Sequence, residues 1–219
     1  MSEQLKIGFV IGNHAFDSYA LNNVLKSFED IEFYPMLMLN YIYDLGHSNY
    51  NLDGYLFYNF DQEVVDPNDP YGAHDVLPRD TFYQMGEDGK GLFFLHHSII
   101  SYVDCAYLND VFSISDRHFK YADGVKMDIK VEKAEHPIMK GVQDFRIEDE
   151  AYLLEAPAEY EDMLLTTENP KSAKSIMWTK KLVNARMVCL ALGHDARAYN
   201  DEMFKRILHQ GILWCCKAI

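Results

Sequence analysis

The sequence predicts an α/β protein with a mostly parallel, doubly wound sheet and an antiparallel extension in its second half. In the first half, short apolar runs are continuous rather than alternating, which is typical of strands buried on both faces. Segments with helical spacing or turn residues separate these runs, as βαβ units require. In the second half, apolar residues alternate with charged ones, which indicates strands with one exposed face.

Four strands are expected in the first half, over residues 5–11, 31–39, 54–60 and 92–95. Apolar residues between Tyr19 and Phe28 recur at helical spacing, and Ser18 is a suitable N-cap. Residues 66–72 are rich in Asp, Pro and Gly and predict a turn, followed by a short helix from about Arg79.

The second half begins with an alternating strand over 125–131. Further short strands are expected around Phe145 and over 163–166, 175–179 and 187–192. A closing amphipathic helix is expected from about Asp201, with Asn200 as its cap. Because we find neither an internal repeat nor a linker, we expect residues 1–219 to form a single domain.

The charge balance excludes some partners. The chain of 219 residues has 20 Lys and Arg against 34 Asp and Glu, a formal net charge of −14. This charge repels nucleic acid and anionic membrane surfaces. The four cysteines fit neither a disulfide framework nor a Cys-x-x-Cys zinc site, and no basic leader or membrane span is evident. The cysteines and the missing export signal predict a cytoplasmic protein, while the charge excludes partners without identifying a substrate.

Histidines follow three of the expected strands. His14 follows the first, with Asp17 three residues later; His96 and His97 follow the fourth; His194 and Asp195 follow strand 187–192. Ligands of open α/β sheets bind outside the carboxyl ends of the strands, so these loops predict a shared crevice. Imidazoles there can transfer protons, polarise a carbonyl or bind a metal, although any single one can instead be a structural histidine.

The remaining histidines are expected to have no catalytic role. His47, His74, His118 and His209 fall on expected loops or helix faces and are expected to be solvated. His136 precedes Pro137, which predicts a residue of a turn or a ligand-binding loop, and the structural role is favoured.

The acidic run 148–150 follows Phe145. One of its carboxyl groups would acquire a raised pKa if it faced a pocket, as a general acid requires, and an exposed acidic turn is the alternative. Asp195 beside His194 is expected to orient the imidazole or a substrate hydroxyl.

Other catalytic motifs are missing from the sequence. It contains no Gly-x-Ser-x-Gly elbow, no P-loop and no Gly-x-Gly-x-x-Gly, so acyl-enzyme chemistry and nucleotide cofactors are unsupported. Tyrosines are abundant, and they suit either sugar stacking or a subunit interface, which leaves a homo-oligomer open. The tyrosines considered are Tyr41, Tyr43, Tyr50, Tyr55, Tyr58 and Tyr199.

Five segments, taken in order, resemble the ThuA-like (trehalose-utilisation) family. They are the loop with His14 and Asp17, Gly-Lys-Gly-Leu-Phe-Phe-Leu-His-His at 89–97, His-Pro-Ile-Met-Lys-Gly at 136–141, Asp-Glu-Ala-Tyr at 149–152, and 192–199 with the later 211–214. The resemblance implies a flavodoxin-like sandwich of the class I glutamine amidotransferase type and a role in carbohydrate metabolism. It also places His96 near the nucleophilic Cys of those enzymes and His194 near their catalytic His, so no amidotransferase activity is expected.

The chain departs from the family pattern at two places. The glycine-rich opening before the first histidine is reduced to Gly12-Asn13, which affects how His14 is presented. The turn before the last strand reads Val-Asn-Ala-Arg at 183–186 instead of Gly-Lys-Gly-Arg.

Our leading hypothesis is a hydrolase, lyase or isomerase that acts on a sugar or keto-sugar. The expected catalytic residues are His96, His194, Asp195 and Glu150, and the expected substrate-binding residues are His14, Asp17, His97 and Tyr199. One alternative is a divalent metal held by ligands from His14, His96, His97, His194 and Glu150. The other is a non-catalytic sugar-binding domain on the same scaffold.

Overall fold

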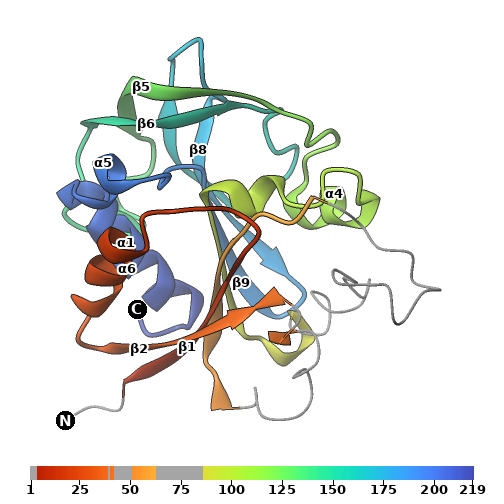
Figure 1. Ribbon diagram of the computed structural model, residues 1–219, viewed down its shortest axis with the longest axis vertical. Coiled ribbons are helices and arrows are strands. Elements are labelled where there is room, and N and C mark those ends of the chain that lie inside the picture. The colour runs from red at the N-terminus through yellow and green to blue at the C-terminus, as the bar shows by residue number, and fades with distance from the viewer. Residues whose placement is uncertain (1–3, 39, 42–50, 63–85) are drawn as a thin grey trace.

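The computed structural model describes residues 4–38, 40–41, 51–62 and 86–219, which form a mixed α/β fold (Figure 1). A nine-stranded sheet has the order β2-β1-β3-β4-β9-β8-β7-β5-β6. Strands β2, β1, β3, β4 and β9 are parallel neighbours, and the remaining pairings are antiparallel. The predicted change from parallel strands to an antiparallel extension in the second half of the chain is therefore confirmed.

The parallel strands coincide with the expected apolar runs. They are β1 (Leu5–Gly12), β2 (Ile31–Leu37), β3 (Gly54–Asn59), β4 (Gly91–Leu95) and β9 (Ala185–Leu190). Every residue of β3 and β4 is buried, as continuous apolar runs predict for strands covered on both faces.

The antiparallel strands are β5 (Lys120–Val131), β6 (Phe145–Leu153), β7 (Asp162–Thr167) and β8 (Ser175–Leu182). Strand β6 is longer than expected, so residues 148–150 lie within a strand and the alternative of an exposed acidic turn is wrong. Pairing with β5 extends the strand here, because Val125 lies opposite Asp149 and Lys126 opposite Glu148.

Helices cover both faces of the sheet. Helices α1 (Ser18–Lys26) and α6 (Glu202–Cys215) pack on one face, and α4 (Ala106–Phe112) lies on the other (Figure 1). A short helix α5 (Ala196–Tyr199) precedes α6, and two 3-10 turns are η2 (His96–Ile100) and η3 (Pro137–Met139). Among the described residues, no helix combines the length and apolar character needed to cross a membrane.

Two helix caps differ from the prediction. Asp17 rather than Ser18 caps α1, accepting a hydrogen bond from the Ala20 N–H at 2.9 Å. Asp201 rather than Asn200 caps α6, accepting from the N–H groups of Met203 and Phe204. In both helices an aspartate carboxylate satisfies the free N–H groups of the first turn.

The core has one apolar layer on each face of the sheet. Along β4, Phe93 enters the layer beneath α6, and Phe94 enters the layer beneath α4. The predicted turn at 66–72, the helix from Arg79, and His47, His74, Tyr43 and Tyr50 lie outside the described residues.

Candidate functional site

Four imidazole rings meet at the carboxyl edge of the parallel strands. His14 follows β1, His96 and His97 follow β4, and His194 follows β9. The ring centroids of His14 and His97 are 4.5 Å apart, those of His96 and His194 are 5.2 Å apart, and those of His14 and His194 are 5.6 Å apart. The structure therefore brings together the three histidine-bearing loops that the strand ends suggested.

His96 is fully buried, and its ring orientation is set by one backbone contact. Its Nδ1 lies 2.9 Å from the carbonyl oxygen of Ala191. Because a carbonyl can only accept, Nδ1 carries the hydrogen, and the Nε2 of the neutral ring is an acceptor. That Nε2 lies 3.1 Å from His194 Nδ1 and 2.7 Å from the Tyr152 hydroxyl.

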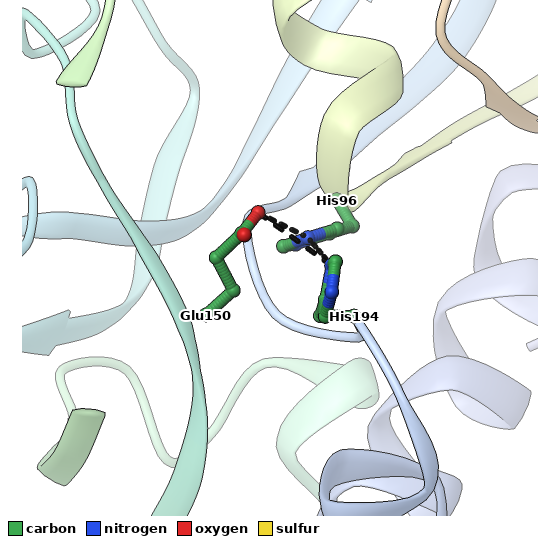
Figure 2. Close-up of side chains that lie close together, drawn as sticks. All are labelled: His96, Glu150 and His194. Atoms are coloured by element: carbon green, nitrogen blue, oxygen red, sulfur yellow. Dashed lines mark hydrogen bonds and ion pairs between the residues drawn. The ribbon is translucent and has the colours of Figure 1, made fainter. Parts of the chain in front are cut away.

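Glu150 of β6 completes this cluster (Figure 2). Its Oε1 lies 3.4 Å from His96 Nε2 and 3.5 Å from His194 Nδ1. Burial raises the pKa of Glu150, but the neighbouring imidazoles of His96 and His194 and a hydrogen bond from Tyr152 outweigh it, so the net pKa is lowered. Glu150 is thus held as a carboxylate, which is the opposite of a raised-pKa acid.

The carboxyl group of the acidic run whose pKa is raised is Asp149, because it is buried. Its oxygens accept hydrogen bonds from the Gly193 N–H at 2.6 Å and the His194 N–H at 3.0 Å. Asp149 thereby fixes the loop that presents His194, and it does not line the pocket described below.

Tyr199 also supports this loop rather than contacting the pocket. It is fully buried, and its hydroxyl donates to the His194 carbonyl at 2.9 Å. The Tyr58 hydroxyl lies 2.9 Å from the Gly193 carbonyl and 2.5 Å from the Tyr199 hydroxyl. Tyr199 therefore positions the His194 loop and is not among the residues that line the pocket described below.

The two expected aspartates lie outside the cluster. Asp17 caps α1, as described above. Asp195 caps α5 and pairs with Arg197, with its Oδ2 2.6 Å from the guanidinium Nη2. Each carboxylate accepts hydrogen bonds from N–H groups at a helix start.

A pocket of about 290 Å³ lies beside the cluster. Its lining residues are His14, Phe60, Gln62, His97, Ile100, Phe119, Tyr121, Glu150 and Tyr152. A larger groove of about 700 Å³ runs along α1, β1 and β2, but its lining contains none of the clustered histidines or Glu150. The smaller pocket is the candidate site, since titratable groups converge on it.

His97 and His14 present unused polar atoms near this pocket. Among the described residues, no side chain or backbone group makes a well-formed hydrogen bond to either ring nitrogen of His97 or to Nδ1 of His14. Burial lowers the pKa of both rings, and the neighbouring imidazoles lower it further. Both rings are thus neutral and able to hydrogen-bond a polar ligand.

Sequence reasoning missed the roles of Tyr152, Asp149 and Tyr58. Tyr152 was detectable, since residues i and i+2 of a strand share a face and Tyr152 follows Glu150 by two. The contacts of Asp149 and Tyr58 with the His194 loop depend on long-range packing that no local pattern encodes.

Fold and site together define a mixed α/β protein with a histidine–carboxylate cluster at the carboxyl edge of its parallel strands. The chain belongs to the ThuA family, described as trehalose utilisation, whose sequence model matches residues 71–215. It has no significant sequence match among curated proteins.

Solved structures share the fold at low sequence identity. A protein described as ThuA-like from Parabacteroides merdae has 14% identity and a TM-score of 0.76, covering 99% of this chain and 91% of its own. A cytoplasmic protein from Salmonella typhimurium has 12% identity and a TM-score of 0.67, covering 96% of this chain and 99% of its own. A protein described as a GMP synthase protein from Thermoplasma acidophilum has 10% identity and a TM-score of 0.58, covering 100% of this chain and 96% of its own.

Proposed function

We propose that this protein is an enzyme of carbohydrate metabolism that binds a sugar or keto-sugar beside Glu150 and transforms it by acid–base chemistry. The observation that carries the proposal is the contact network of Glu150, His96, His194 and Tyr152 at the wall of the 290 Å³ pocket. Membership of a family described as trehalose utilisation supports the carbohydrate substrate.

The network suits proton transfer in the metal-free protein. Glu150 is the base, because it is ionised and borders the pocket. His96 Nε2 and His194 Nδ1, each within 3.5 Å of that oxygen, pass the proton on or return it to the product. Asp195 is not assigned a catalytic role, since it pairs with Arg197.

Substrate binding falls to the aromatic and neutral polar groups of the pocket. Phe60 and Phe119, with ring centroids 6.2 Å apart, offer apolar faces to a sugar ring. His14 and His97 offer their unused nitrogens to hydroxyl or carbonyl groups. A neutral, hydroxyl-rich ligand satisfies both kinds of group without bringing further charge into a buried site.

We further propose the finer fold assignment, a flavodoxin-like sandwich of the class I glutamine amidotransferase type formed by residues 1–219 as one domain. The similarity to the Thermoplasma protein described as a GMP synthase protein supports it. A histidine at position 96 supports the proposal that amidotransferase activity is lost. The Salmonella neighbour, described as cytoplasmic, supports a cytoplasmic location.

The test begins with thermal-shift screening of sugars and keto-sugars, followed by product detection for each compound that stabilises the chain. We expect Glu150→Gln and His194→Ala to lower turnover by roughly 10²–10⁴-fold while the ligand still binds. The matched controls are Glu168→Gln, which removes an exposed carboxylate paired with Lys174, and His118→Ala, which removes an exposed imidazole.

The outcomes separate the candidate functions. Unchanged turnover in both His96→Ala and His194→Ala would contradict the proposal. Stabilisation by a sugar without any product would instead support a non-catalytic sugar-binding domain.

A further inference from the structure

We propose that His96 Nε2, His194 Nδ1 and Glu150 Oε1 form a binding site for one divalent transition-metal ion, with Zn²⁺ preferred. The proposal concerns ion binding alone, so it does not depend on the substrate proposed above. The two proposals describe the metal-loaded and metal-free forms of the same cluster.

The spacing of the three atoms is the first argument. They are separated by 3.1, 3.4 and 3.5 Å. In a tetrahedral zinc site with bonds of about 2.0–2.1 Å, neighbouring ligand atoms lie about 3.3–3.4 Å apart. A single ion slightly out of the plane of the three atoms can therefore reach all of them at normal bond lengths without any rearrangement of the backbone.

The orientation of His96 is the second argument. Its Nδ1 donates to the Ala191 carbonyl at 2.9 Å, which leaves the Nε2 lone pair directed into the cluster. Metal-binding histidines commonly donate their other ring N–H to a carbonyl or carboxylate in this way. His194 is fixed independently, because Asp149 accepts hydrogen bonds from the N–H groups of Gly193 and His194.

The crowding at Nε2 is the third argument. This atom has a single lone pair, yet the Tyr152 hydroxyl at 2.7 Å and His194 Nδ1 at 3.1 Å both approach it, as does the Glu150 carboxylate. Its lone pair can accept one good hydrogen bond, so the other groups crowd this atom in the metal-free cluster. A cation between the three ligand atoms would take the Nε2 lone pair, while the Tyr152 hydroxyl keeps its hydrogen bond to Glu150.

The donor set and its surroundings favour a transition metal over Mg²⁺ or Ca²⁺. Two imidazoles and one carboxylate match the ligand preference of Zn²⁺, whereas the harder cations prefer oxygen ligands. The site has three protein ligands, and Glu150 borders the pocket. Three ligands with one position open towards a pocket are typical of catalytic rather than structural zinc.

The test uses the full untagged chain, stripped with a chelator and titrated with Zn²⁺ by calorimetry, with elemental analysis of the loaded protein. We expect one Zn²⁺ per chain and at least a tenfold weaker affinity in His96→Ala and Glu150→Gln. Affinity should be unchanged in Glu168→Gln and in His118→Ala, which removes an exposed imidazole paired with two aspartates. Mg²⁺ should not compete.

Co²⁺ substitution adds a measurement that does not depend on the folding of any variant. We expect the intense visible absorption of tetrahedral Co²⁺ in the wild-type protein and its loss on addition of Zn²⁺. Absence of a stoichiometric ion, or equal binding by Glu150→Gln and Glu168→Gln, would overturn the metal site. Sugar turnover by the stripped protein is scored separately, so failure of either proposal is distinguishable from failure of the other.

Discussion

Asp149 and Glu150 are neighbours on β6, yet their carboxyl groups do opposite things. Successive residues of a strand point to opposite faces, so Asp149 meets the backbone of the His194 loop and Glu150 meets the imidazoles. Burial raises the pKa of both carboxyl groups; it prevails at Asp149, whereas at Glu150 Tyr152 and the imidazoles together outweigh it and lower the pKa. Two adjacent acids thereby occupy separate environments: Asp149 holds the His194 loop, and Glu150 faces the imidazoles as the base that we propose.

His136 shows how a buried histidine couples the fold to pH. Its Nδ1 accepts a hydrogen bond from the Ile138 N–H at 3.2 Å, capping η3, and its ring lies 5.1 Å from the Trp214 ring. Burial lowers the pKa of His136 below 6.5, despite the opposing charge of Asp162. The structural role expected for this residue fits its cap and its burial.

The pH dependence of stability follows from that lowered pKa. Below pH 6.5 the unfolded chain protonates His136 while the folded chain does not, so the free energy of unfolding falls as pH falls towards the folded pKa. This residue can contribute up to about 1.4 kcal/mol per pH unit in that window. We expect His136→Asn, which keeps a capping oxygen, to lose less stability than the wild type between pH 7 and 5 in urea unfolding.

His118→Ala is the control for this measurement. Its exposed ring is paired with Asp116, which raises the pKa of His118, so its stabilising effect is lost as pH rises rather than as pH falls. Equal acid sensitivity of His136→Asn and the wild type would contradict the prediction.

At the scale of elements, the loop between β9 and α5 is the part of the site most dependent on its supports. Gly193 has φ +112, and a Cβ there would lie 3.0 Å from the Phe204 ring, so only glycine fits the turn without strain. Three side chains hydrogen-bond the backbone of this loop: Asp149 accepts from the Gly193 N–H, Tyr58 donates to the Gly193 carbonyl and Tyr199 donates to the His194 carbonyl. The position of His194 is therefore fixed by three residues that do not border the candidate pocket.

Asp149→Asn tests this support. The amide keeps one acceptor but loses the charge that binds the Gly193 and His194 N–H groups, so we expect a loss of about 1–3 kcal/mol in the free energy of unfolding. Because His194 would be displaced, kcat should fall more than KM rises. Asp128→Asn, which removes an exposed carboxylate paired with Arg146 on the same hairpin, should change neither quantity appreciably.

The strands and the histidines at their ends could be predicted from the sequence, because continuous apolar runs identify strands buried on both faces. The end points of β1, β3 and β4 lie within a residue of the expected ones. The sequence could not decide whether residues 148–150 lie in a strand or in an exposed turn, since the extent of β6 depends on pairing with β5. Asp17 and Asp195 lie close to histidines in the sequence, and both also cap helices, a role that aspartate prefers.

At the scale of the whole molecule, the site joins the two halves of the sheet. The parallel half supplies all four histidines, and the antiparallel half supplies Glu150 and Tyr152. In Figure 1, β5 and β6 form the upper part of the molecule, next to α5. A bulge in β5 between Ala122 and Val125 brings Asp123 to Arg197 of α5, which also contacts Glu148 of β6 at 3.5 Å.

Arg197 thus connects the β5–β6 hairpin to the parallel half, and we expect its loss to loosen the site more than the fold. Exposed ion pairs contribute about 0.2–1 kcal/mol each, so Arg197→Gln should lower the free energy of unfolding only slightly. Hydrogen exchange in β6 should nevertheless accelerate, and ligand affinity should fall, because Glu150 and Tyr152 would no longer be held against the imidazoles. Arg146→Gln is the matched control, since Arg146 pairs with Asp128 within the hairpin and does not bridge the halves. Equal effects of the two substitutions on exchange and affinity would show that the hairpin is held by its core packing alone.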